Sequence, residues 1–302
     1  MFPSLPLLSR GIHSRSEVIR RLGLLRRSKQ RRDHFDEILV KGRPQIENLL
    51  SKHEDMRFKE ILVSNRLSNY DFLRNFRAHR IRKVDPELLY YISYQSKPLS
   101  NSKGNKSSGE DGELSDSDTA ILSDPAIADS LMLGTLPKPA MKLPADPRFL
   151  LCIDRVIFPD NVGSLIRSAH AIGGVDGIIG TPGTCDFNGW KVLEASRGYG
   201  FGIPKKVLPG TDALLDYIIE HKLVPLVGHS REGIDIRQVD LSKHNGVMVI
   251  IGNERHGPAK EILDVAVRVK IPIDERINSL NAAVAGGLLL QYAKGLLTKP
   301  LS

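Results

Sequence analysis

The sequence predicts an α/β protein in which a parallel sheet with helices on both faces forms the larger domain and a small α/β module precedes it. Two observations predict this class: short apolar runs alternate with amphipathic segments over residues 149–297, and a similar alternation occurs over residues 35–94. Strands that alternate with helices are typical of parallel sheets with helical cover. With 302 residues, of which 41% are hydrophobic, the chain is long enough for two cores.

The first 32 residues form a basic leader, with nine of the chain's 43 Lys and Arg residues but only one of its 35 acids. The rest of the chain is therefore formally neutral. An Arg- and Ser-rich, acid-poor segment with apolar residues at helical spacing is typical of a mitochondrial transit peptide, whereas a secretory signal needs a longer apolar run. The alternative is a basic arm that stays on the protein and binds RNA. We expect residues 1–32 to be a transit peptide and the protein to act in the mitochondrial matrix.

Residues 35–97 predict the small α/β module. The predicted strands cover residues 37–42, 58–65 and 80–85, and the predicted helices cover residues 43–52, 68–79 and 86–93. Five cations lie close together in this part of the sequence: Arg74, Arg77, Arg80, Arg82 and Lys83. Such a cluster is a candidate surface for RNA phosphates, and a solvated helix face is the alternative.

Residues 98–146 differ from both neighbours because they are rich in Ser, Gly, Asp, Glu and Lys and then in Pro. This composition is too polar to bury a core. It predicts a flexible acidic and Pro-rich linker between two domains.

Residues 147–302 predict the larger domain. Its strands are expected at 149–154, 177–180, 205–209, 223–230, 246–254 and 267–273, and its helices at 161–173, 190–198, 211–222, 258–266 and 278–293. Ligands of parallel sheets bind beyond the carboxyl ends of the strands. The loops that should carry function are therefore 154–163, 180–190, 228–234, 252–258 and 272–281.

The loop before the first of these helices carries Asp160 and Asn161, either of which can cap the helix, and Arg167 follows inside the helix. A cation near a helix N-terminus opposes the helix dipole. Arg167 is therefore better explained by an anionic partner, a phosphate or a carboxylate, although a plain surface arginine is the alternative.

A second loop, Gly252-Asn253-Glu254, follows an apolar strand. A glycine loop at a strand end exposes backbone groups to a ligand, and Glu254 can accept from hydroxyl groups or pair with Arg167.

The closing helix contains two successive glycines, Gly286 and Gly287. Each costs about 1 kcal/mol relative to alanine, so the pair predicts the close approach of another backbone or a ligand. A capped core helix that packs on another helix is the alternative. Ser279 or Asn278 is the expected N-cap, with Asn281 inside the first turn.

Two classes of protein are not favoured. No apolar run approaches the ~20 residues that span a bilayer. Cys152 and Cys185 show no CxxC spacing, so the sequence predicts neither a disulfide framework nor a metal site.

Three stretches, DNVGSLIRSAHAIGG, IIGNERHG and IPIDERINSLNAAVA, resemble in type, order and spacing the three motifs of the SpoU/TrmH branch of the SPOUT methyltransferases. The resemblance extends over residues 149–296. Through VKGRPQIENLL and KEILVSN, the N-terminal module resembles the family's substrate-binding domain of ribosomal-protein L30/L7Ae type.

The resemblance implies a deep trefoil knot near the C-terminus, an exception to unknotted topology, and it accounts for the small residues of the last helix. It also implies S-adenosylmethionine as cofactor and a homodimer whose active site is completed across the interface. The cofactor pocket would be formed by Gly228, Ile251, Gly252, Asn253, Ile271, Leu280 and Ala282.

The resemblance assigns the main catalytic role to Arg167. Since an arginine with a pKa above 12 is a poor base, we expect it to clamp the target phosphate and orient the ribose 2′-hydroxyl. Glu254, Ser279 and Asn281 would position that arginine and the ribose, and Asn161 would hold the first loop.

The sequence departs from the family pattern at Arg255 and Pro258, where glycine and leucine are common. Arg255 would contact RNA or narrow the pocket. In the N-terminal module, SYQSKP stands where an HQG ending is usual. These departures concern the placement of the substrate rather than the fold.

The function expected from the resemblance is 2′-O-ribose methylation of RNA, at a guanosine of mitochondrial large-subunit ribosomal RNA. The alternatives are a catalytically inactive, RNA-binding ribosome-assembly factor and a tRNA 2′-O-methyltransferase.

Overall fold

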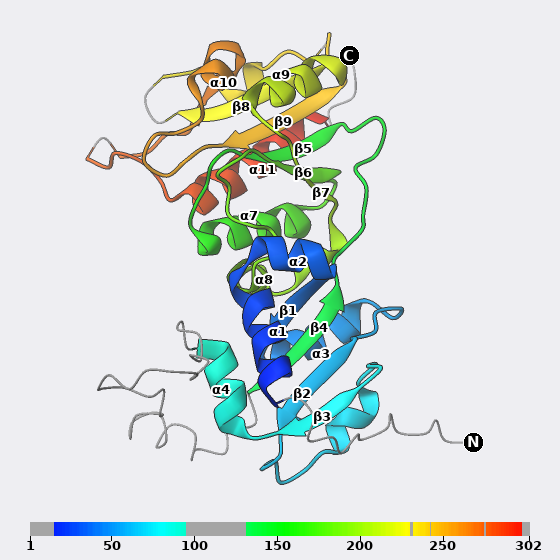
Figure 1. Cartoon of the computed structure of the whole chain (residues 1–302). Helices are drawn as coiled ribbons and strands as arrows, with labels where there is room; N and C mark the ends of the chain where they lie inside the picture. The colour runs from blue at the N-terminus through cyan, green and yellow to red at the C-terminus, as the bar shows by residue number, and fades with distance from the viewer. Residues whose placement is uncertain (1–14, 95–130, 230–231, 242, 275, 298–302) are drawn as a thin grey trace. The chain divides into compact units, whose positions relative to one another are not determined.

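The computed structural model describes residues 15–94, 131–229, 232–241, 243–274 and 276–297 (Figure 1). The chain divides into two units, residues 1–138 and 139–302. We call them the N-terminal and the C-terminal unit and describe each by itself.

The N-terminal unit is built on a four-stranded sheet of order β1-β4-β2-β3. Its strands are β1 (Glu37–Lys41), β2 (Glu60–Ser64), β3 (Ile81–Val84) and β4 (Met132–Pro137). Strand β4 runs antiparallel to β1 and β2, whereas β2 and β3 are parallel. Helices α3 (Arg43–Lys52) and α4 (Pro86–Tyr94) confirm two of the three predicted helices, while the third is only a 3-10 turn, η1 (Asp71–Asn75).

Two helices, α1 (Arg15–Arg27) and α2 (Lys29–Phe35), occupy most of the expected leader. Leu22 and Leu25 of α1 are fully buried in the core of the N-terminal unit. The side chain of Arg32 is also buried, and it donates to the carbonyl of Leu25 at 2.5 Å. The leader boundary at residue 32 is therefore wrong, because a basic amphipathic segment has the same pattern in a transit peptide and in a helix that packs on a sheet. Residues 1–14 lie outside the described residues.

The linker boundary at residue 146 is also wrong, because residues 132–137 form the inner strand β4. The strand pairs with β1 and β2, and its residues 132–136 are buried. Its apolar run follows a long polar segment, so composition alone assigned it to the linker. Residues 98–130 of the predicted linker lie outside the described part of the chain.

Two cations of the predicted phosphate surface have internal partners instead. Arg77 donates to the backbone carbonyls of His53 and Met56, at 3.0 and 3.3 Å, and so satisfies groups just beyond the end of α3. Arg82 forms an ion pair with the buried Glu60 at 2.5 Å. These two side chains stabilise the fold.

The other three cations of that cluster are exposed. Arg74 pairs with Asp71 on the surface at 3.1 Å, and Lys83 Nζ lies 3.4 Å from the ring centroid of Tyr70. For Arg74, Arg80 and Lys83, contact with RNA phosphates stays a prediction.

The C-terminal unit contains a six-stranded sheet of order β10-β8-β9-β5-β6-β7 in which each neighbouring pair is parallel. Its strands are β5 (Phe149–Ile153), β6 (Gly177–Gly180), β7 (Lys205–Val207), β8 (Leu223–His229), β9 (Gly246–Ile251) and β10 (Val267–Lys270). This confirms the predicted fold class.

Helices cover both faces of this sheet (Figure 1). One layer contains α7 (Pro159–Ile172), α8 (Trp190–Ala195) and α11 (Ala282–Leu297), and the other contains α9 (Thr211–Glu220) and α10 (Lys260–Val265). Two short 3-10 turns, η2 (Tyr199–Gly202) and η3 (Ile236–Gln238), complete the unit. Alternate residues of β5 enter opposite cores: Leu151 joins the α7–α11 core and Cys152 the α9–α10 core.

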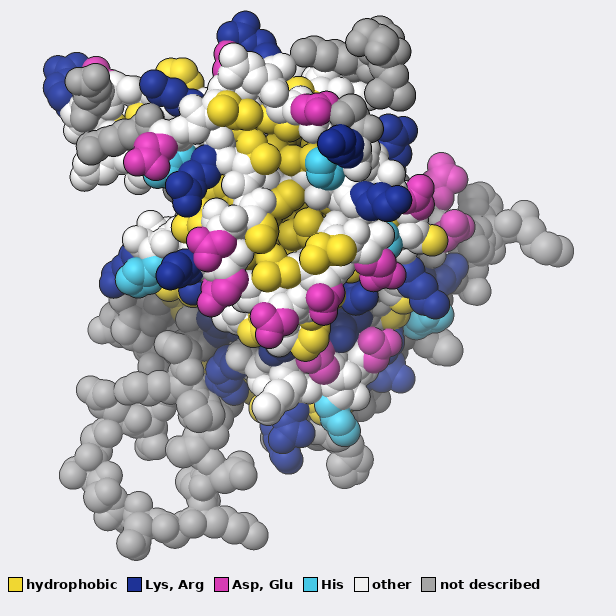
Figure 2. All heavy atoms as spheres, turned by 90° about the horizontal axis from the view of Figure 1, so that it is seen from above, with side chains coloured by type: hydrophobic (Ala, Val, Ile, Leu, Met, Phe, Trp, Pro, Cys, Tyr) yellow, Lys and Arg dark blue, Asp and Glu magenta, His cyan; other side chains and the backbone are white. Residues whose placement is uncertain are grey.

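The outer surface of the α9–α10 layer carries apolar side chains. Figure 2 looks onto this side and shows hydrophobic side chains gathered along its middle, with charged residues around them. Ile219 of α9 and Val265 of α10 are exposed hydrophobic residues of these two helices.

Gly286 of α11 lies close to side chains of neighbouring elements. A Cβ atom at this position would lie 2.2 Å from Leu165 Cδ2, the end of a side chain of α7, so a larger residue would require that side chain to shift. At Gly287 the nearest atom would be 3.7 Å away, an ordinary contact. The atoms nearest to both glycines belong to side chains, so the structure supports the alternative, a core helix that packs on another helix, rather than the close approach of a backbone. The trefoil knot stays a prediction.

Neither Cys152 nor Cys185 forms a disulfide in the structure, and burial raises the pKa of Cys152 well above its usual range. Among the helices described, none combines the length and apolar character that a membrane crossing requires. The described residues also contain no cluster of His, Cys, Asp or Glu that could hold a metal ion.

Candidate active site

One cavity of about 800 Å³ opens at the carboxyl end of the C-terminal sheet, the edge where parallel sheets bind ligands. It is lined by the ends of β8 and β9, the loop that follows β9, the segment that leads into α11 and the start of α7. The lining residues are Phe158, Asp160, Asn161, Val227, Gly228, His229, Ile250, Ile251, Gly252, Asn253, Glu254, Arg255, Gly257, Pro258, Ile271, Ile273, Ser279, Leu280, Asn281, Ala282, Ala285 and Leu289.

All seven residues predicted for the cofactor line this cavity: Gly228, Ile251, Gly252, Asn253, Ile271, Leu280 and Ala282. They come from three segments far apart in sequence. The walls of the cavity at these residues are mostly aliphatic side chains and backbone, and such walls suit a flat, largely apolar ligand group that is held by a few polar contacts. Their role in binding stays a prediction.

A chain of three polar side chains crosses one rim of the cavity. Asn281 donates through Nδ2 to Asn161 Oδ1 at 2.9 Å, and Asn161 donates through Nδ2 to Glu254 Oε1 at 2.9 Å. The Glu254 carboxylate also accepts from the backbone amides of Ile157 and Phe158, each at 3.4 Å. Each asparagine orientation is therefore fixed by its neighbour, and three separate loops are held together.

Asn281 is also the N-cap of α11, because its Oδ1 accepts from the amide of Ala283 at 2.9 Å. The expectation that Ser279 or Asn278 would cap this helix is therefore wrong. The helix begins at Ala282, later than the sequence pattern indicated. Ser279 lines the cavity instead.

Arg167 does not line this cavity. It is exposed on α7, six residues and thus about 9 Å along the helix axis from Asn161, and it makes no hydrogen bond or ion pair with any described residue. It lies instead in a second depression of about 480 Å³, which we call the α7–α8 depression. This depression is lined by Asp160, Ser164, Arg167, Trp190, Lys191, Glu194, Ala195 and Arg197. The predicted pairing of Arg167 with Glu254 is therefore wrong within one chain.

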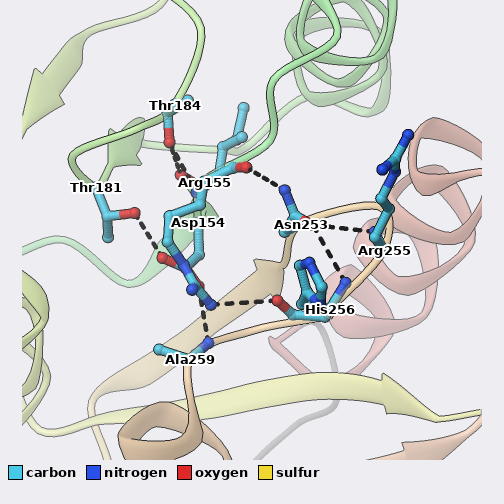
Figure 3. A network of polar contacts seen from close by, with 10 residues as sticks. Asp154, Arg155, Thr181, Thr184, Asn253, Arg255, His256 and Ala259 are labelled. Atoms are coloured by element: carbon cyan, nitrogen blue, oxygen red, sulfur yellow. Dashed lines mark hydrogen bonds and ion pairs between the residues drawn. The ribbon is translucent and has the colours of Figure 1, made fainter.

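A buried carboxylate, Asp154, holds the loops behind the cavity (Figure 3). Its side chain is 0% exposed and accepts from Thr181 Oγ1 at 2.5 Å and from the amide of Ala259 at 2.9 Å. The guanidinium of Arg155 donates to the same carboxylate at 3.2 Å and to the carbonyl of Gly257 at 3.3 Å. The ends of β5 and β6 and the loop after β9 are thereby joined.

The backbone around Arg155 completes this network. Asn253 Nδ2 donates to the carbonyl of Arg155 at 2.9 Å, and Asn253 Oδ1 accepts from the amides of Arg255 and His256 at 3.0 and 3.2 Å (Figure 3). Arg155 has a φ of 57°, a left-handed conformation that few side chains adopt without surrounding contacts. The loop that carries Glu254 is thus fixed at both of its ends.

Sequence reasoning missed Asp154 and His229, and it treated Asp160 only as a possible cap of the helix. Asp154 directly follows a fully apolar strand, and this position at a strand end was the available signal. Asp160 lines both the cavity and the α7–α8 depression, and His229 lines the cavity next to Gly228. Arg255 is exposed and lines the cavity. Its two predicted roles, contact with RNA and narrowing of the pocket, stay predictions.

Residues 148–291 match the model of the SpoU rRNA Methylase family. A 23S rRNA (guanosine(2553)-2'-O)-methyltransferase, RlmP, from Bacillus subtilis is 33% identical over 158 residues, which are 50% of this chain and 60% of that protein. A 23S rRNA (adenosine(1067)-2'-O)-methyltransferase from Streptomyces laurentii is 28% identical over 153 residues, 50% of this chain and 56% of that protein. The chain thus spans little more than half the length of these curated relatives.

Solved structures resemble the fold of this chain over a longer range than residues 148–291. The SpoU methyltransferase AviRb from Streptomyces viridochromogenes, crystallised with the cofactor AdoMet, superposes with a TM-score of 0.70 and 22% identity over 94% of this chain and 99% of that one. An AdoMet-bound rRNA methyltransferase from Sinorhizobium meliloti superposes with a TM-score of 0.67 and 20% identity over 97% of this chain and 98% of that one.

Proposed function

We propose that the protein methylates the ribose 2′-hydroxyl of RNA with S-adenosylmethionine, because residues 148–291 match the model of the SpoU rRNA Methylase family. The observation that carries the proposal is the Asn281–Asn161–Glu254 chain at the rim of a cavity whose other walls are aliphatic and backbone. It places hydrogen-bonding groups where a ribose can lie beside a bound cofactor.

The residues of the cavity fit this cofactor. A volume of about 800 Å³ is within the usual range for ligands of this size. Aliphatic walls at Ile251, Ile271 and Leu280 suit an adenine ring, and carboxylates at Glu254 and Asp160 favour a sulfonium cation. S-adenosylmethionine, when bound, supplies an electrophilic methyl group and needs no metal.

The chain's own residues orient the acceptor. Glu254, held by Asn161 and two backbone amides, is an acceptor for a ribose hydroxyl, and Ser279 adds a second hydroxyl contact at the cavity wall. Orientation of a hydroxyl toward a methyl donor supplies much of the rate in such a transfer. Arg167 provides the charge that clamps the RNA phosphate.

We propose a homodimer, because Arg167 lies outside the cavity of its own chain and α11 presents an exposed apolar face in the described part of the chain. Val284, Leu288 and Tyr292 recur every four residues on α11 and are 52%, 38% and 51% exposed. A second copy seated on this face would bury these side chains and bring one chain's Arg167 toward the other's site. Leu288→Glu should therefore give monomers in analytical ultracentrifugation, whereas Ile219→Glu, at the exposed site on α9, should leave the dimer intact. Dimers that persist in the Leu288 variant would refute this interface.

The substrate that we propose is mitochondrial large-subunit ribosomal RNA, with a guanosine as target. The family model and the names of the relatives support ribosomal RNA as the substrate. A guanosine target is supported by the name of the Bacillus subtilis relative, a 23S rRNA guanosine 2'-O-methyltransferase. The matrix location rests on the basic N-terminal composition. Since residues 15–32 pack into the N-terminal unit, a cleaved leader would have to end before α1.

The experiment that tests this function maps ribose methylation across mitochondrial ribosomal RNA in cells that lack the protein. The cells are complemented with the wild type, Arg167→Ala or Lys260→Ala, the last removing an exposed cation from α10. One 2′-O-methyl group should be restored by the wild type and the Lys260 variant, whereas Arg167→Ala should lose about a hundredfold or more in rate. Its affinity for S-adenosylmethionine should stay within a few-fold, since Arg167 does not line the cavity.

The alternatives predict other outcomes of the same experiment. An unchanged methylation map, with a ribosome-assembly defect that Arg167→Ala repairs, would identify a non-catalytic assembly factor. A methyl group lost from a tRNA ribose and from no ribosomal RNA would identify a tRNA methyltransferase.

A further inference from the structure

The α7–α8 depression is a second concave site that the proposed methyl transfer does not use beyond Arg167. Its walls are held firmly. A Cβ atom at Gly163 would lie 2.4 Å from Ala195 Cβ and 2.8 Å from the carbonyl oxygen of Val192, so α7 and α8 pack as closely as their backbones allow. Val192 and Leu193 of α8 are buried beneath it. A ligand would therefore meet a preformed groove.

Three kinds of group line this groove: an aromatic ring, Trp190; three cations, Arg167, Lys191 and Arg197; and two carboxylates, Asp160 and Glu194. The excess of one positive charge is too small for a polyphosphate and suits a single phosphodiester. Carboxylates repel free anions but accept hydrogen bonds from the amino and imino groups of bases. An aromatic face beside cations and carboxylates thus matches the base and phosphate of one nucleotide.

The position of the depression connects it with the cavity. Asp160 lines both, and α7 carries Asn161 at the cavity and Arg167 in the depression. A strand whose ribose lay at the Asn281–Asn161–Glu254 chain would therefore place a neighbouring nucleotide over α7. Lys191 Nζ lies over the Trp190 ring, 5.6 Å from its centroid, so a base that stacks on this face displaces the flexible ammonium group toward the phosphate of the same nucleotide.

We propose that the α7–α8 depression binds one unpaired nucleotide of the substrate RNA, next to the ribose that is methylated. This rests on the proposed function. Trp190 stacks on the base, Lys191 contacts its phosphate, and Glu194 accepts from the edge of the base. The depression thereby selects an unpaired strand and contributes to the choice of sequence.

Trp190 allows a direct test, since it is the only tryptophan of the chain. Its fluorescence is followed while the full-length protein, without cofactor, is titrated with short single-stranded RNAs that differ at one central base, and with a duplex. Single strands should quench the fluorescence to saturation, and the duplex should do so far less. A duplex that quenches equally would refute recognition of an unpaired nucleotide.

Matched variants separate the contribution of Trp190 stacking to RNA binding from the contribution of the Lys191 charge. In fluorescence-anisotropy titrations with labelled RNA, Trp190→Ala should weaken binding about fivefold or more, while Trp190→Phe keeps most of the affinity. Lys191→Gln should lower the dependence of log affinity on log salt by about 0.7, whereas Lys260→Gln should not change it. Glu194→Gln should alter the preference among central bases.

The outcomes distinguish this inference from the proposed function. RNA that binds by anisotropy without changing Trp190 fluorescence, or a salt dependence equal in the Lys191 and Lys260 variants, would overturn the nucleotide site while methyl transfer could still be observed. Quenching with no methyl transfer would overturn the enzyme and keep the site. The Trp190→Phe variant and thermal melting exclude loss of folding as the cause of weaker binding.

Discussion

The two units of the protein bury carboxylates in different ways. In the N-terminal unit, Glu37 and Glu60 lie beneath α1, and Arg21 donates to them at 2.9 and 2.7 Å. Each carboxylate also has another cation: Lys59 lies 3.1 Å from Glu37, and Arg82 lies 2.5 Å from Glu60. These ion pairs reach the surface, since the Arg21 side chain is 31% exposed.

In the C-terminal unit, Asp154 is completely buried and accepts from two neutral groups, Thr181 Oγ1 and the Ala259 amide, as well as from the guanidinium of Arg155. Its partners belong to loops that line or support the cavity, whereas the partners of Glu37 and Glu60 belong to a helix and a sheet. Buried charge in the first unit attaches α1 to the sheet, and in the second it fixes the geometry of a site. Substitution of Arg21 should therefore lower stability alone, whereas substitution of Asp154 should lower both stability and cofactor binding.

The largest effect is expected for Asp154→Ala. It leaves the Thr181 hydroxyl and the Ala259 amide without this acceptor and the Arg155 guanidinium with only the Gly257 carbonyl, so the free energy of unfolding of the C-terminal unit should fall by about 3–5 kcal/mol. Calorimetry measures the loss, and titration with S-adenosylmethionine at a temperature where the variant is folded measures binding.

The isosteric Asp154→Asn is the control for volume. It keeps a donor–acceptor pair with Thr181 and should retain more stability than the alanine variant, with weaker cofactor binding than the wild type. Equal binding by all three proteins would mean that Asp154 has no influence on the cavity.

A smaller effect is expected for Arg21→Ala. Glu37 and Glu60 each keep one cation, so the N-terminal unit should lose about 2–3 kcal/mol, with cofactor binding unchanged. Arg20→Ala removes an exposed cation from the same helix and should cost less than about 0.5 kcal/mol. If the two variants were equally stable, α1 would not be fastened by these ion pairs.

The smallest effect concerns Lys205, a half-buried cation that donates to the backbone carbonyls of Gly200 and Ile203. Burial lowers the pKa of Lys205 from 10.5 to about 8. Between these values the unfolded chain binds more protons than the folded one, so the contribution of Lys205 to stability increases as pH rises from about 8 to 10.5.

The wild type should therefore gain about 2 kcal/mol relative to Lys205→Met when the pH is raised from 7.5 to 10, by chemical denaturation at each pH. Because other lysines and tyrosines titrate equally in both proteins, the difference isolates Lys205. Parallel pH profiles would show that its pKa is not lowered.

Periodicity predicted the elements of the C-terminal unit well, because strands buried on both faces are short apolar runs and their helices have one apolar side. The same reasoning missed β4, whose pairing partners lie far away in sequence. Periodicity also assigned α1 to a leader outside the fold, because the sequence does not show that the apolar face of α1 packs on the N-terminal sheet. Loop chemistry identified Asn161, Glu254 and Asn281, but not that the asparagines would bond to each other.

The sequence by itself determined the fold class, the position of the ligand-binding edge and the polar residues that gather there, because local patterning and strand-end loops depend on near neighbours along the chain. Only the tertiary structure decided that Arg77 and Arg82 stabilise the fold, that Asp154 lies behind the cavity and that Arg167 faces a separate depression. These outcomes depend on which distant groups share a buried space. A buried charge must find its partners in three dimensions, and sequence spacing does not encode their distances.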